Sequence, residues 1–76
     1  MAAAMSKPGL GRLLGSGKEA EVFECGADVV KLYRSSEPKR AAFREAALLA
    51  MAESFGLPVP TVHGVRQIGD RWCIAM

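Results

Sequence analysis

A glycine-rich turn near the start of the chain is the first feature that could do chemistry. It reads Gly15-x-Gly17-x-x-Ala20-x-Val22, with strand-like text on both sides. Glycine has no Cβ, so its backbone can approach an anion closely. The backbone N–H groups of Gly15, Ser16 and Gly17 could therefore cover the phosphates of a nucleotide. An ordinary glycine hairpin that binds nothing would have the same pattern.

Two charged residues further along the chain could form an ion pair beside this turn. Alternation along a strand puts Val29, Lys31 and Tyr33 on one face. Glu45 is expected in a helix, in the middle of an apolar stripe of four residues within about 60° of it. These four are Ala41, Leu48, Leu49 and Ala52. An acid there is costly unless it is paired, so Lys31 is its expected partner and Glu53 the alternative. A lone strand lysine, by contrast, is usually solvated.

The glycine pattern also suggests the dinucleotide-binding turn of a βαβ unit. That unit needs a helix after the turn and a crossover of a dozen or more residues to a parallel strand. Gly17 is followed by only residues 18–26 up to and including the start of the next turn signal, at Gly26. This segment is too short for a helix and its two loops, so the sequence favours a hairpin.

The elements that would position these residues follow from local patterns. The sequence predicts strands over residues 10–14, 21–25, 29–33, 61–68 and 71–76, and a helix over 39–55. Ser36 is the expected N-cap, and Gly56 ends the helix. Gly69-Asp70 fits a two-residue hairpin turn of type II′. The predicted fold is therefore α+β, a five-stranded antiparallel sheet with one helix packed on it.

Composition restricts the class of protein. The chain has 76 residues, 50% of them hydrophobic, and a net charge of +2. This favours one folded unit over disorder. The few aromatic residues and the lack of a basic face disfavour nucleic-acid binding, including an OB-type fold. No apolar run approaches the ~20 residues of a membrane span. Residues 1–8 are expected to form a flexible tail, and they lack the features of a signal peptide. Cys25 and Cys73 are expected to be reduced thiols. Both expectations favour a cytoplasmic location.

The order of these features resembles a known family. A glycine hairpin, a Val-Val-Lys strand and a helix with an inward acid follow one another in residues 13–76, as in the small lobe of the kinase-like superfamily. The closer resemblance is to the aminoglycoside phosphotransferase and choline kinase branch. It rests on Phe-Arg-Glu-Ala-Ala-Leu at 43–48 and Gly-Leu-Pro-Val-Pro-Thr-Val at 56–62. Ala20 replaces the third glycine of the motif, which is a small departure.

The resemblance implies an ATP site. Lys31 would contact the phosphates and Glu45 would anchor it. The other residues carried over are the phosphate cover Gly15, Ser16 and Gly17, the adenine contacts Val22 and Val29, and Met76 near the hinge. Residues 9–76 would then be a nucleotide-binding small lobe.

The family's catalytic-loop and metal-binding aspartates lie in a second, larger lobe, and no segment here matches either one. The chain is therefore expected to be the ATP-binding lobe of a small-molecule phosphotransferase, truncated before the catalytic lobe. The complete enzyme would transfer the γ-phosphoryl group to a hydroxyl. The alternative is a non-catalytic interaction or dimerisation module. In either case the apolar underside of an isolated lobe favours self-association.

Overall fold

The computed structural model describes residues 9–76, so the expected flexible tail over 1–8 lies outside the described residues. Five strands and one helix follow in sequence. They are β1 (Leu13–Ser16), β2 (Ala20–Cys25), β3 (Asp28–Tyr33), α2 (Lys39–Ser54), β4 (Gly64–Ile68) and β5 (Arg71–Ala75). Within the described residues, no helix is both long and apolar enough to cross a membrane.

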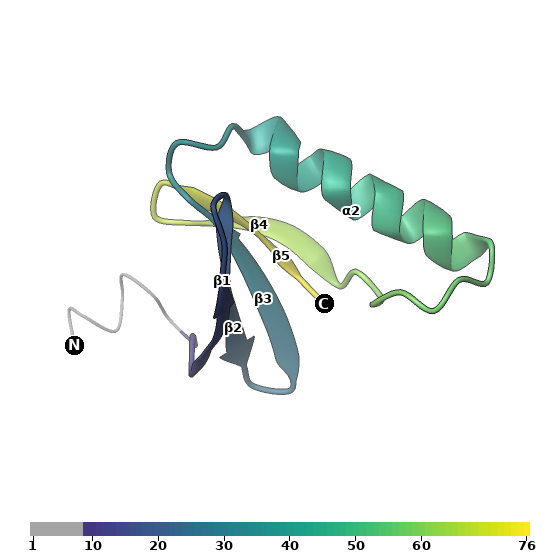
Figure 1. The fold of residues 1–76 in the computed structure, drawn as a ribbon, viewed down its shortest axis with the longest axis horizontal. Helices are drawn as coiled ribbons and strands as arrows, with labels where there is room; N and C mark the ends of the chain where they lie inside the picture. Colours follow the sequence, from purple (N-terminus) through teal and green to yellow (C-terminus); the bar gives the residue numbers. More distant parts are fainter. Residues whose placement is uncertain (1–8) are drawn as a thin grey trace.

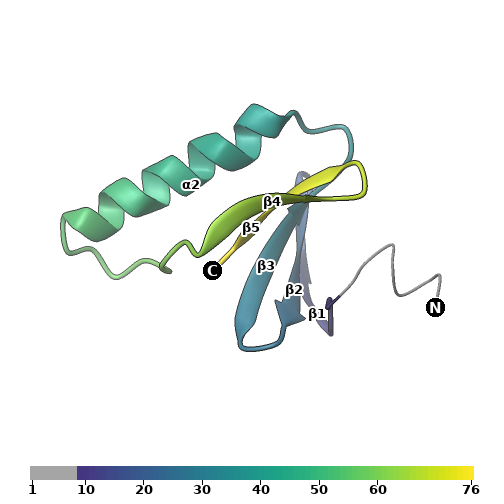
Figure 2. The ribbon, with the colours of Figure 1, turned by 180° about the vertical axis from the view of Figure 1, so that it is seen from behind.

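The five strands form one antiparallel sheet in the order β1-β2-β3-β5-β4. Helix α2 lies along one side of the sheet, over β4 and β5 (Figures 1 and 2). The predicted α+β fold is therefore confirmed. Strand β3 lies at the centre of the sheet, between the β1–β2 hairpin and β5, so a side chain from β3 can reach both the hairpin and the helix.

Two of the hairpins turn at glycines that need an unusual backbone conformation. Gly26 and Gly69 both have φ of 62°, and no non-glycine residue among the described residues has positive φ. Positive φ at the first turn residue only is typical of type II′ turns, which match the twist of paired strands. This pattern agrees with the turn predicted at Gly69-Asp70.

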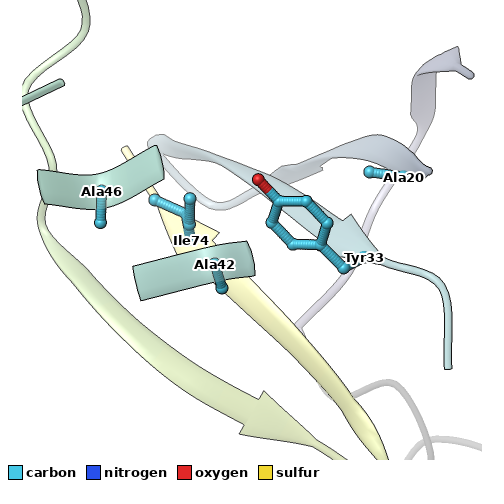
Figure 3. Close-up of a cluster of buried hydrophobic side chains, with 5 residues drawn as sticks. All are labelled: Ala20, Tyr33, Ala42, Ala46 and Ile74. Atoms are coloured by element: carbon cyan, nitrogen blue, oxygen red, sulfur yellow. The ribbon is translucent and has the colours of Figure 1, made fainter. Parts of the chain in front are cut away.

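Helix α2 packs on the sheet through small residues. Ala42 and Ala46, one turn apart, are buried against Ile74 of β5 and Tyr33 of β3. In Figure 3 the Tyr33 ring lies between Ala20 and the side chains of Ile74 and Ala42. Because alanine has only a methyl group, the helix axis can come close to the sheet at this point.

The opposite face of the sheet carries a second apolar cluster. Val30, Leu32, Cys73 and Ala75 are buried there, and Phe23 and Ile68 are among the partly buried residues that pack against them. Strand alternation explains this division, since Val30 and Leu32 point away from the helix while Lys31 and Tyr33 point toward it. The face that carries Lys31 is therefore the helix face.

Several predicted element bounds and the predicted helix cap differ from the structure, most of the bounds by one residue. The fourth strand begins at Gly64 rather than residue 61, because the chain first returns from the helix end, where the Thr61 hydroxyl donates to the Glu53 carboxylate at 2.5 Å. Ser36 does not cap the helix, since Pro38 holds the N-cap position without a side-chain cap bond. Strand β1 begins at residue 13 and continues into Gly15 and Ser16. Gly56, with φ of 82°, follows the helix as expected.

Candidate functional site

The expected ion pair between β3 and α2 is present. Lys31 Nζ donates to both carboxylate oxygens of Glu45, at 2.8 Å to Oε1 and 3.0 Å to Oε2. The two side chains are 29% and 34% exposed, so the pair is half-buried. The alternative partner, Glu53, is bonded to Thr61.

Tyr33 is a third member of this cluster, and sequence analysis assigned it no role. Its hydroxyl donates to Glu45 Oε1, while Lys31 Nζ lies 5.4 Å from the centre of its ring. A signal was available in the alternation that puts Tyr33 on the same face as Lys31. A buried phenol there needs a hydrogen-bond partner, and Glu45 is the nearby acceptor.

The protonation states in this Lys31–Glu45–Tyr33 cluster follow from burial and its hydrogen bonds. Burial raises the pKa of Glu45, but hydrogen bonds from Lys31 and Tyr33 and the charge of Lys31 outweigh it, so the pKa lies below its ordinary value. Burial, followed by the hydrogen bond to Glu45 and its charge, raises the pKa of Tyr33. At neutral pH Glu45 is therefore a carboxylate and Tyr33 a donor.

The environment of Glu45 differs from the expectation in one respect. The prediction put Glu45 in the middle of the buried stripe, but Ala42 and Ala46 form that stripe and Glu45 lies beside it. Leu48, expected in the stripe, is 56% exposed. The alanines decide how the helix is rotated about its axis, because they allow the closest approach to the sheet. Glu45 therefore lies at the edge of the packed surface, where Lys31 can reach it.

A pocket of about 380 Å³ lies between the glycine hairpin (β1, residues 17–19 and β2) and β3. Its volume falls within the range of small-molecule sites in proteins. Five of the eight predicted site residues line it, together with Lys18, Glu19 and Ala20. The five are Gly15, Ser16, Gly17, Val22 and Lys31. Lys31 pairs with Val22 across the two strands, so both point to the same face.

The turn of this hairpin is displaced from its expected position. Gly15 and Ser16 belong to β1, β2 begins at Ala20, and the Gly17 N–H donates to Ala20 O at 2.9 Å, so the loop covers residues 17–19. A register shift between Leu13 and Gly15 accompanies this. The Gly17 amide is therefore already bonded within the hairpin.

Val29 and Met76 lie together at the other end of β3. Each donates its N–H to the carbonyl of the other, at 2.7 and 2.8 Å. Neither lines the pocket that contains Lys31. The Met76 N–H is therefore already bonded to Val29.

A second hollow of about 540 Å³ lies on the helix side of the cluster. Tyr33, Glu45 and Glu19 line it together with residues of α2 and the segment before it, including Arg40, Arg44 and Leu49. Glu19 lines both hollows, and Lys31 lines only the pocket under the hairpin. The Lys31–Glu45–Tyr33 cluster therefore lies between them, and only the hairpin side combines glycines with a lysine.

Among residues 9–76, no three histidine, cysteine, aspartate or glutamate side chains gather in a way that could hold a metal ion. No protein-family model, curated protein or solved structure matches the chain.

The half-buried Glu45 should contribute to the pH dependence of stability. Its folded-state pKa is depressed below the ordinary value of 4.5. The stability it contributes is present above that value and is lost as the pH falls through the folded-state pKa. We expect Glu45→Gln to destabilise the protein at pH 7 by about 1–3 kcal/mol, with the gap shrinking below about pH 4.5. Urea unfolding of the wild type and Glu45→Gln between pH 3 and 7 measures this difference in the free energy of unfolding.

The matched control for this prediction is Glu24→Gln, which removes the same charge from an exposed pair with Arg12. Exposed pairs contribute about 0–1 kcal/mol, so this change should have a small effect. A gap for Glu45→Gln that stays constant on acidification would contradict the role assigned to the Glu45 charge.

Proposed function

We propose that this chain is the ATP-binding lobe of a phosphotransferase that moves the γ-phosphoryl group of ATP to a hydroxyl of a small molecule. The observation that carries the proposal is the position of Lys31, on the wall of the pocket beneath the glycine hairpin and bonded to both oxygens of Glu45. A lysine restrained in this way by an acid of the helix is a device for presenting a cation to nucleotide phosphates.

The hydrogen-bonding capacity of Lys31 supports this. An ammonium group has three N–H donors, and Glu45 accepts two hydrogen bonds from it. The remaining donor and the positive charge can serve a phosphate oxygen in the pocket. The Tyr33 hydroxyl donates to the same carboxylate. This second hydrogen bond keeps the Glu45 side chain in place, and so restricts the movement of Lys31.

The glycines give a second line of support. Gly15 and Gly17 have no positive φ, so their backbone conformation does not require glycine. A Cβ at Gly15 would meet no atom within 4 Å, and one at Gly17 would meet only Ala20 O, at 3.9 Å. Packing does not require glycine here either. Close approach of a ligand to the hairpin backbone would explain why glycine stands at these two positions.

The rest of the proposal comes from the family resemblance. Val22 would contact the adenine from the pocket wall, with the side chains of Val29 and Met76 further along the same face. A second lobe would supply the acceptor site and the aspartates that hold magnesium with ATP. An ATP-dependent enzyme of this kind would work in the cytoplasm.

The proposal predicts ATP binding that depends on Lys31. A charge-assisted hydrogen bond contributes about 1.5–3 kcal/mol, so Lys31→Ala should weaken ATP binding by at least about tenfold. The matched control is Lys39→Ala, which removes an exposed lysine from the start of α2, where its Nζ lies over the Trp72 ring. Titration with ATP, followed by amide chemical shifts, measures the affinities. Equal binding by the wild type and Lys31→Ala, or none by either at millimolar ATP, would contradict the proposal.

A stripe on the outer surface of α2 favours a second candidate function, that of a dimerisation module. Leu48 and Met51 belong to α2 and Phe55 is its C-cap residue; their spacings of three and four residues put the three side chains on one side. They are 56%, 54% and 76% exposed. Adjacent exposed apolar side chains commonly mark interaction surfaces. In a twofold dimer the stripe would pack against the same stripe of a second copy.

This candidate predicts concentration-dependent self-association through the stripe. A charge in the middle of an apolar interface is strongly unfavourable, so Met51→Glu should shift the chain to monomer and raise the dissociation constant at least about tenfold. Ala50→Glu, an exposed change on another side of the helix, is the matched control. Sedimentation equilibrium measures it. A wild-type chain that stays monomeric at all concentrations would rule out the dimerisation module.

A further inference from the structure

Arg34, the first residue after β3, contacts the loop of the glycine hairpin. Its Nη2 donates to Gly17 O at 2.8 Å and to Ser16 Oγ at 3.1 Å. Its Nε lies 3.2 Å from Lys18 O and 3.3 Å from Gly17 O. One guanidinium therefore binds two successive carbonyls of the loop, an arrangement suited to its planar set of donors.

These contacts determine the direction of the neighbouring amides. In a trans peptide the C=O of one residue and the N–H of the next point in opposite directions. The structure has no cis peptide bond among the described residues. Because the carbonyls of Gly17 and Lys18 point toward Arg34, the N–H groups of Lys18 and Glu19 point away from it.

Those two amides are available to a ligand. Within the part of the chain that the structure describes, neither the Lys18 N–H nor the Glu19 N–H has a hydrogen-bond acceptor. Both residues line the pocket that contains Lys31, whereas Arg34 does not. Two successive free N–H groups form a concave site that favours anions.

The Arg34 guanidinium is also held by charged residues on the face of the sheet opposite α2. Glu21 Oε2 lies 3.9 Å from Arg34 Nη1, while Glu21 Oε1 accepts from Arg71 at 2.8 Å. Arg71 in turn donates to Tyr33 O at 2.9 Å. These contacts connect β2, β3 and β5, so the position of Arg34 is tied to the sheet.

We propose that Arg34 is a positioning residue for phosphate binding, which holds the hairpin loop so that the Lys18 and Glu19 amides are presented to the pocket. This inference rests on the proposed ATP site. Arg34 binds the loop on the side away from the pocket and does not contact the nucleotide. Its removal leaves Lys31 and Glu45 in place but releases the two carbonyls that set the direction of the amides.

The experiment compares the wild type with Arg34→Gln, Arg34→Lys and the control Arg66→Gln. Arg66 is exposed on β4, the opposite edge strand, so its replacement makes the same charge change far from the hairpin. Heteronuclear NOE values of the Lys18 and Glu19 amides report loop order without ligand. ATP titration gives the affinity, and thermal unfolding checks that each variant is folded.

We expect lower NOE values at both amides and about five- to tenfold weaker ATP binding in Arg34→Gln. Arg34→Lys should lose less loop order and less ATP affinity than Arg34→Gln, since lysine can donate to one carbonyl but lacks the planar set of donors that binds two. Arg66→Gln should match the wild type. Unchanged loop amides in Arg34→Gln, or lost order with unchanged affinity, would overturn the inference. If Arg34→Gln lowers the NOE values but the wild type binds no ATP, the loop restraint by Arg34 would be supported and the proposed ATP-binding function would be overturned.

Discussion

The bond between Lys31 and Glu45 is the interaction on which the site depends. It joins the central strand to the only helix of the described residues, and its 2.8 Å length makes it a charge-assisted hydrogen bond as well as an ion pair. Tyr33 adds a second donor to the same carboxylate. A half-buried acid with two donors stays ionised, and a lysine bonded to both of its oxygens has little freedom to turn toward solvent.

The packing of α2 makes this bond geometrically available. Ala42 and Ala46 bring the helix close to Ile74, and Glu45 then lies at the margin of the contact, within reach of β3. Larger side chains at the alanine positions would push the helix away from the sheet and lengthen the bond. The same rotation of the helix turns Leu48 and Phe55 outward, so one packing choice determines both the site and the apolar stripe.

The fold and the ion pair could be predicted from the sequence because both follow from periodicity. Alternation in β3 decided the face of Lys31, and helical spacing put Glu45 on a sheet-facing side. The sequence predicted Glu45 in the middle of the buried stripe rather than at its edge, because α2 has apolar residues on almost every side. Only tertiary packing decides how the helix is rotated about its axis. Strand alternation puts Tyr33 on the face of Lys31 and so within reach of Glu45, but the contact of Arg34 with Gly17, 17 residues away, follows from no local rule.

The measurement that tests this account most directly is a double-mutant cycle on ATP affinity with Lys31→Met and Glu45→Gln. If Glu45 acts by holding Lys31, each single change weakens binding and the double variant binds about as weakly as Lys31→Met alone. The coupling free energy would then be about 1–2 kcal/mol. Additive losses from the two changes would show that they act independently, and would contradict the account.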